Sequence, residues 1–220
     1  MSPLVLIAVK RMLVRYARPI LRAELGKERG GEILNRIIKS KTRTSVETTT
    51  AGGTLMVHCA ALTVMLYREL IAEGLSDIAA REMTARVTAE VYKRMGKIPW
   101  WIAQLMRRRP ATRLRFATDV FRYFPFSPPD YVMEDVRSDE DTVAFDVKRC
   151  PTAEHFAHEG LPKLCQATFC NLDFDLAERW GASLERTTAL ARGESRCDFR
   201  WHVRVAPSVT GEQQKGGKTQ

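Results

Sequence analysis

The sequence has few cysteines and lacks the short motifs of several common protein classes. Its five cysteines among 220 residues are an odd number and too sparse for a disulfide framework, so we expect free thiols and a cytoplasmic location. The apolar stretch 2–9 follows no basic region and is itself followed by Lys and Arg, the reverse of a signal peptide. No Gly-rich phosphate loop, Gly-x-Ser-x-Gly or His-Glu-x-x-His motif occurs. These absences argue against a secreted disulfide protein, a phosphate-loop enzyme and the common serine and zinc hydrolases.

Basic residues are in excess, and they are concentrated near the start. The chain has 35 Lys and Arg against 26 Asp and Glu, a net charge of +9 and a pI of about 9.6. Residues 1–50 contain 11 basic and 4 acidic residues, whereas 151–220 are balanced. With 45% hydrophobic residues the chain is able to form a core. We therefore divide it into a basic helical segment 1–50, a single α+β domain 51–207 and a disordered polar tail 208–220.

Hydrophobic spacing predicts a mixed α+β fold: a helical N-terminal half packed on a small antiparallel sheet, with a long helix and a C-terminal β-hairpin. Ser76 is the expected N-cap of the fourth helix. Pro19 is expected to interrupt the first helix, and Gly30 and Gly31 to loosen the second. The expected helices are 4–23, 23–39, 55–73, 77–95 and 162–180, with a short one within 151–160; the expected strands are 143–147, 183–191 and 196–205.

The segment 99–129 mixes aromatic residues with arginines. We favour an amphipathic connector whose aromatic side chains cap the core while its arginines stay solvated. Peripheral contact with a membrane is the alternative, and nucleic-acid binding is not expected. The apolar start, 4–9, is compatible with a helix-mediated homodimer.

Four of the five cysteines lie in the last third of the chain, two of them in the predicted helix 162–180. Cys165 lies in the centre of its apolar stripe, where a thiol is a small core residue. Cys170 lies off that stripe and shares a face with Asp173, one helical turn away. A thiol beside a carboxylate at the edge of a core is typical of a pocket.

The other two cysteines of this group lie on predicted strands. Cys150 follows the first strand, where sites are often built. Cys197 lies on the inward face of the last strand, together with Phe199, Trp201, Val203 and Val205. Asp198 and Arg200 lie on the opposite face of that strand. All these side chains belong to one α+β segment.

Cys170 and Asp173 together suit attack on an electrophilic carbon. A thiolate is a strong nucleophile, and a carboxylate binds a cationic amidine or moves a proton. Because a neighbouring Asp raises the pKa of a thiol, a cation such as Arg186 or Arg200 has to lie close. Buried cysteines with a packing role alone are the plain alternative.

A metal site is a competing use of the same residues. Cys150, His155 and His158 form Cys-x4-His-x2-His, and Cys165 or Cys170 would complete a zinc shell. This spacing fits no standard zinc pattern and no paired Cys-x2-Cys is present. A non-catalytic domain that holds a small molecule or zinc through these cysteines is therefore the second functional hypothesis.

Several blocks of the sequence together resemble a known enzyme family. They are GGTLMVHCAALTVMLYRELIAEGLS (52–76), FDVKRCP (145–151), LCQATFCNLDFDLAERWG (164–181) and LERTTALARGESRCDFRW (184–201). From about 52 to 205 the chain resembles the L-2-amino-thiazoline-4-carboxylic acid hydrolase family. The strand, the helix and the terminal Gly-x3-Cys-x-Phe hairpin are more remotely similar to small-molecule-binding domains of the 4-vinyl-reductase type.

The resemblance implies hydrolytic ring opening of a thiazoline that carries an exocyclic amine and a carboxylate, with no cofactor. It also implies roles for the residues at the family's motif positions. Cys170 or a water attacks the ring carbon between nitrogen and sulfur, and Asp173 holds the amidinium. The candidate catalytic residues are Cys150, Cys170, Asp173 and Cys197, and the candidate substrate-binding residues are Arg186, Arg200 and Asp198. The expected partner is a small-molecule substrate.

Overall fold

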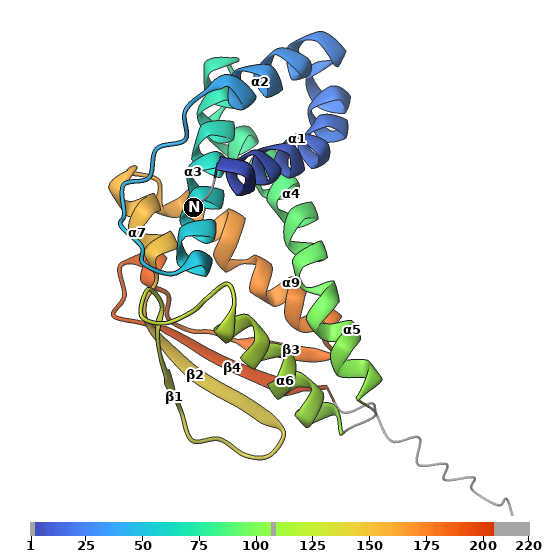
Figure 1. Cartoon of the computed structure of the whole chain (residues 1–220), viewed down its shortest axis with the longest axis vertical. Helices are drawn as coiled ribbons and strands as arrows, with labels where there is room; N and C mark the ends of the chain where they lie inside the picture. The colour runs from blue at the N-terminus through green and yellow to red at the C-terminus, as the bar shows by residue number, and fades with distance from the viewer. Residues whose placement is uncertain (1–2, 107–108, 205–220) are drawn as a thin grey trace, which may run out of the picture.

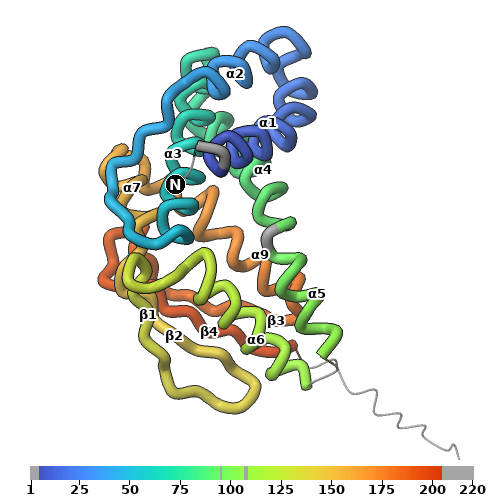
Figure 2. Tube along the Cα trace, in the orientation of Figure 1, coloured from blue at the N-terminus to red at the C-terminus, as the bar shows by residue number. Residues whose placement is uncertain are grey.

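The front of the chain is helical in the computed structural model, which describes residues 3–106 and 109–204 (Figures 1 and 2). The predicted disordered tail 208–220 lies outside the described residues. The helices of this half are α1 (Pro3–Leu25), α2 (Lys27–Lys39), α3 (Ala51–Ala72), α4 (Asp77–Met95), α5 (Lys97–Leu105) and α6 (Pro110–Tyr123).

The second half forms a four-stranded antiparallel sheet with short helices, which confirms the mixed α+β fold. The sheet order is β1-β2-β4-β3. Its elements are β1 (Val132–Asp135), β2 (Thr142–Arg149), α7 (Pro151–His158), α8 (Pro162–Cys165), the π-helical turn η1 (Gln166–Cys170), α9 (Leu172–Arg179), β3 (Ala182–Glu185), the 3-10 turn η2 (Leu190–Arg192) and β4 (Cys197–Val203).

Two local expectations about the first helices are wrong. Helix α1 continues through Pro19 to Leu25, although proline removes one backbone hydrogen bond of a helix. Gly30 does not loosen α2; it lies against α1, where an added Cβ would meet the backbone of Leu21 at 3.1 Å. The glycine therefore permits a close crossing of the two helices.

Helix α3 begins at Ala51, before the predicted start at residue 55. Gly52 and Gly53 lie in its first turn, where a larger side chain would clash with neighbouring residues. Thr50 caps the helix by accepting a hydrogen bond from the Gly53 amide. The buried Asp130 carboxylate in turn accepts hydrogen bonds from the amides and hydroxyls of Thr49 and Thr50. A Cβ on Gly53 would lie 2.1 Å from that carboxylate. The close approach ties the N-terminus of α3 to the loop that precedes β1.

Helix α3 is long and apolar enough to cross a membrane by length and composition alone, but 56% of its most apolar window is buried inside the molecule. This burial is typical of the core helix of a globular protein. Its apolar side chains pack with those of α1, α2, α4, α7 and α8 in one hydrophobic core. The basic helices α1 and α2 thus share a core with α3.

A second core lies against one face of the sheet. Along β2 and β4 the inward residues are paired across the strands: Val143 with Trp201, Phe145 with Phe199 and Val147 with Cys197. Helices α6 and α9 pack against the strands, and the side chains are largely aromatic (Figure 1). The inward face predicted for the last strand, with Cys197, Phe199 and Trp201, is confirmed.

Two elements of the second half differ from the prediction. The expected helix 162–180 is broken into α8, η1 and α9. In the hairpin, β3 ends at Glu185, and an irregular loop with η2 leads to β4. Only residues 183–185 of the predicted strand 183–191 therefore belong to a strand.

Candidate active site

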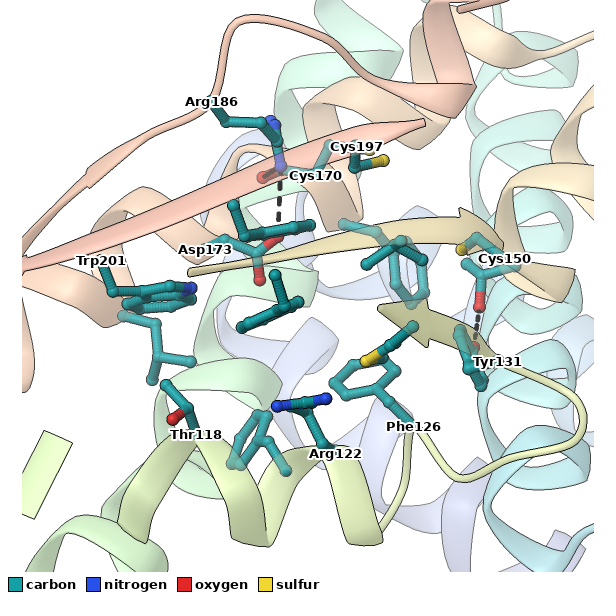
Figure 3. A pocket seen from close by; sticks show the side chains of 18 of the residues that line it. Thr118, Arg122, Phe126, Tyr131, Cys150, Cys170, Asp173, Arg186, Cys197 and Trp201 are labelled. Atoms are coloured by element: carbon teal, nitrogen blue, oxygen red, sulfur yellow. Dashed lines mark hydrogen bonds and ion pairs between the residues drawn. The ribbon is translucent and has the colours of Figure 1, made fainter. Parts of the chain in front are cut away.

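A pocket opens between the sheet, α6 and the η1–α9 segment (Figure 3). Its space, counted together with its opening to solvent, is about 830 Å³. Nine of its 21 lining residues are aromatic, and three are charged. The lining includes Tyr92, Phe121, Arg122, Phe126, Tyr131, Phe145, Cys150, Cys165, Phe169, Cys170, Asp173, Trp180, Arg186, Cys197, Phe199 and Trp201.

A buried ion pair lies at one end of this pocket. Arg186 Nη1 donates to Asp173 Oδ2 at 3.2 Å and to the carbonyl oxygen of Cys170 at 3.0 Å. The guanidinium is only 6% exposed and lies over the rings of Phe174 and Phe199. Rings on both sides exclude water and hold the cation through its π-contacts. Asp173 and Arg186 therefore form a fixed polar pair in an apolar wall.

Tyr92 completes this pair from α4. Its hydroxyl donates to Asp173 Oδ1 at 2.8 Å. Burial raises the pKa of Asp173 to about 6, while Arg186 and the hydrogen bond from Tyr92 act in the opposite direction. A carboxylate with a pKa near neutrality is able to accept and return a proton.

The π-helical turn explains how Cys170 enters the pocket. In an α-helix, residues five apart point about 140° away from each other. Here the Asn171 amide donates to the carbonyl of Gln166, five residues earlier, at 2.9 Å. This wider turn brings Cys170 beside Cys165, with their Sγ atoms 3.9 Å apart. Such turns occur frequently at functional sites.

The pKa values single out one thiol among the four in the pocket. The contact with Cys165 and the charge of Arg186 lower the pKa of Cys170. Burial raises the pKa of Cys197 to about 11, and it raises the pKa of Cys150 further. A thiolate is the nucleophilic form of cysteine, so Cys170 is the reactive candidate.

Cys150 and Cys197 line the pocket as predicted, but their sulfur atoms also accept hydrogen bonds from the backbone. Cys150 Sγ accepts from the Ala153 amide at the start of α7, at 3.4 Å. Cys197 Sγ accepts from the Leu190 amide at 3.3 Å. These bonds hold α7 and η2 in place, so both cysteines have a structural use. Their predicted catalytic roles stay predictions.

Arg200 and Asp198 do not line the pocket, which corrects their expected place in substrate binding. Both lie on the outer face of β4, as strand alternation requires. Arg200 bonds Asp146 at 2.9 Å and the Phe145 carbonyl at 3.1 Å. Asp198 accepts from Thr187 and Thr188, and these hydrogen bonds outweigh burial and lower its pKa. The two residues hold the sheet and the β3–β4 loop.

The alternative zinc residues are engaged elsewhere. His155 Nδ1 lies 2.6 Å from the Ser45 hydroxyl, and His158 Nδ1 lies 3.1 Å from the Ser45 carbonyl oxygen. Across residues 3–106 and 109–204, no group of three or more His, Cys, Asp or Glu side chains is placed to hold a metal ion. The two histidines instead attach the loop before α3 to α7.

Three pocket residues had no assigned role in the sequence. Tyr92 comes directly after the last predicted apolar position of α4. The sequence of α4 does not indicate that the partner of Tyr92 is Asp173 on α9. Arg122 belongs to the arginine-rich segment, where it pairs with Asp135 at 2.7 Å. Trp201 was placed on the inward strand face, but its free Nε1 was not foreseen; this buried atom has no hydrogen-bond partner among the described residues.

Fold and pocket together define an α+β protein with a thiol and an ion pair in an aromatic cavity. The profile of the L-2-amino-thiazoline-4-carboxylic acid hydrolase family matches residues 55–201, two thirds of the chain. The chain belongs to this family, whose name indicates a hydrolase. A search of curated proteins gives no significant match.

Solved structures give only distant likenesses. One is the crystal structure of an Fe(II) unliganded H-NOX protein from K. algicida, with 11% identity and a TM-score of 0.43 over 86% of this chain and 94% of that chain. A point mutant of the same protein gives 11% identity and a TM-score of 0.42, over 87% and 94%. These TM-scores are below 0.5 and do not establish a shared fold.

Proposed function

We propose that this protein is a hydrolase that opens a small cyclic amidine of the 2-amino-thiazoline-4-carboxylate kind, with Cys170 as the nucleophile. The observation that carries the proposal is the combination, in one pocket, of a thiol with a lowered pKa and the Asp173–Arg186 pair. Membership of the hydrolase family supports the reaction class.

The reaction adds one water to the ring. The Cys170 thiolate forms a bond to the carbon between the ring nitrogen and sulfur, and that carbon's bond to one ring heteroatom breaks. The leaving heteroatom takes a proton from the amidinium nitrogen. Water, with Asp173 as the base, then attacks the same carbon and displaces the thiolate, which leaves a carbonyl in an open chain. Asp173 also holds the cationic amidine while the bond forms.

The pocket indicates the shape of the substrate. Arg186 and Arg200 are bonded to Asp173 and Asp146, so we assign neither of them as the receptor of a substrate carboxylate. Arg122 faces the pocket, and its partners Asp135 and Asp119 are 78% and 57% exposed, so an anionic group is able to replace them (Figure 3). The aromatic wall favours a planar apolar body between the two ends. The Trp201 Nε1 donor favours an acceptor atom on that body.

The test is turnover of 2-amino-thiazoline-4-carboxylate and of an aryl-substituted analogue, with the gain of one water followed by mass spectrometry. Cys170→Ala should lower kcat/KM by at least about a thousandfold and leave the circular dichroism spectrum unchanged. Cys59→Ala is the matched control, because this partly buried thiol belongs to the helical core, and burial raises its pKa to about 12. Full activity of Cys170→Ala would refute the nucleophile.

The second candidate is a binding domain without catalysis, and the nearly apolar wall of the pocket favours it. It predicts that both compounds bind and neither is converted. Native alkylation distinguishes the two hypotheses: the hydrolase requires Cys170 to react at neutral pH and to be protected by the substrate, whereas a packing role leaves all thiols inert until unfolding.

A further inference from the structure

Helix α5 exposes a stripe of large apolar side chains. Ile98, Trp101, Ile102 and Leu105 follow helical spacing, and at about 100° per residue they fall within one narrow arc. Ile98 is 66% exposed, and Trp101 and Leu105 are each 62% exposed. Single exposed apolar residues are ordinary, but four in one stripe on a nine-residue helix indicate a contact surface.

The opposite side of α5 is firmly attached to the protein. Pro99 and Ala103 are buried, and the ring of Trp100 stacks on Trp180 with centroids 6.3 Å apart. Helix α5 also packs along α6 (Figure 1). The exposed stripe is therefore a fixed part of the surface.

Basic side chains lie beside one end of this stripe. A shallow depression at the base of α5 brings together Lys97, Arg179 and Lys93 with Trp101, and Lys93 is also paired with Glu90 at 2.6 Å. Between Glu90 and Asp119 the sequence contains no acidic residue and eight basic ones: Lys93, Arg94, Lys97, Arg107, Arg108, Arg109, Arg113 and Arg115. An apolar stripe bordered by cations is complementary to a surface with negative groups above an apolar layer.

We propose that α5 docks this protein onto the surface of an anionic lipid membrane. The four apolar side chains enter the boundary between headgroups and acyl chains, and Lys93, Lys97 and Arg179 meet lipid phosphates. Two copies of the chain meeting through this face would bring like charges together, which disfavours a symmetric dimer. Three of the four stripe residues are aliphatic and do not stack on nucleic-acid bases, so the chemistry favours lipid.

The test is cosedimentation with vesicles of phosphatidylglycerol and phosphatidylcholine in equal amounts, and with phosphatidylcholine alone. We expect the full chain to bind the anionic vesicles at least tenfold more tightly, and to lose most binding in high salt. Ile98→Glu should weaken binding at least tenfold. Ile78→Glu is the matched control, because Ile78 is 63% exposed near the opposite end of α4 from α5; its binding should be unchanged.

Equal binding by these two variants, or no binding of the wild type to anionic vesicles, would overturn the proposal. Two further results would do so as well. One is a dimer in sedimentation velocity that only Ile98→Glu dissociates, without vesicle binding. The other is a single-stranded oligonucleotide that binds through α5 more tightly than the vesicles do. The assay needs no substrate, so its result is independent of the proposed reaction.

Discussion

The two hydrophobic cores border cavities with different linings. At the edge of the helical core, the cavity between α1, α3, α4 and the η1–α9 segment is lined by apolar side chains, threonines and Tyr92, and by no charged residue among those described. In the sheet-side core, the pocket is lined by rings and holds Asp173, Arg186 and Arg122. Counted in the same way, the two spaces are about 480 Å³ and 830 Å³. In the sheet-side pocket, aromatic rings and an opposite charge replace water around Asp173 and Arg186.

The largest effect should follow the loss of the buried cation. Arg186→Ala leaves the Asp173 carboxylate buried without its partner, and we expect the free energy of unfolding to fall by about 3–5 kcal/mol. The variant also raises the pKa of Asp173 further, so the native state holds this proton more tightly. That contribution is present at low pH and lost as pH rises through the raised pKa. Urea unfolding should therefore show a larger loss at pH 8 than at pH 5.

Arg200→Ala is the control for this prediction. Its partner Asp146 keeps Arg196 at 3.2 Å and Lys148 at 3.6 Å, both from the outer face of the sheet. We expect a loss of about 1 kcal/mol or less because these partners remain solvated. Equal losses for the two variants would show that the Asp173–Arg186 pair contributes no more to stability than the Arg200–Asp146 pair does.

A pair of leucines compares the packing of the two cores. Leu66→Ala removes a fully buried side chain from the helical core and should destabilise the protein by about 2–5 kcal/mol. Leu176 is also buried but borders the existing pocket, so Leu176→Ala enlarges a space that already opens to solvent. In thermal or urea unfolding, we expect Leu176→Ala to lower the free energy of unfolding by about 1 kcal/mol less than Leu66→Ala does. A larger loss at Leu176 would contradict the contrast.

Removal of one hydroxyl should shift the pH dependence of the proposed reaction. In the wild type, activity should fall as pH drops through about 6, because protonated Asp173 no longer accepts a proton. Tyr92→Phe removes a hydrogen bond that lowers this pKa, so the fall should move to higher pH. The measurement is kcat/KM from pH 5 to 8. A loss of activity without a shift would assign Tyr92 a packing role.

The smallest effect concerns two tryptophans that stack on each other, with centroids 5.6 Å apart. Trp180 Nε1 donates to the Gly96 carbonyl at 3.1 Å, whereas Trp201 Nε1 has no described partner. Trp180→Phe loses a hydrogen bond as well as ring contacts, so it should lower the free energy of unfolding by about 1 kcal/mol more than Trp201→Phe does. Trp201→Phe should raise KM about three- to tenfold for a substrate with an acceptor, and Trp180→Phe should raise KM less. The opposite pattern would remove Trp201 from substrate binding.

Sequence patterns predicted the helices well where one local signal dominates. Helix α4 begins and ends at the predicted residues because Ser76 caps it and Gly96 follows it. Strand alternation correctly placed Cys197 and Trp201 inward and Arg200 outward. The broken helix 162–180 escaped this reasoning, since a π-helical turn leaves no mark in hydrophobic spacing.

By itself, the sequence determined the α+β class, the family and the group of cysteines in the last third of the chain. The tertiary structure alone decided the surroundings of each thiol. It brought Arg186 rather than Arg200 to Asp173, added Tyr92 from a distant helix and turned Cys170 toward Cys165. The physical reason is that a pKa depends on burial and on charges within a few ångströms, and these neighbours come from segments far apart in the chain.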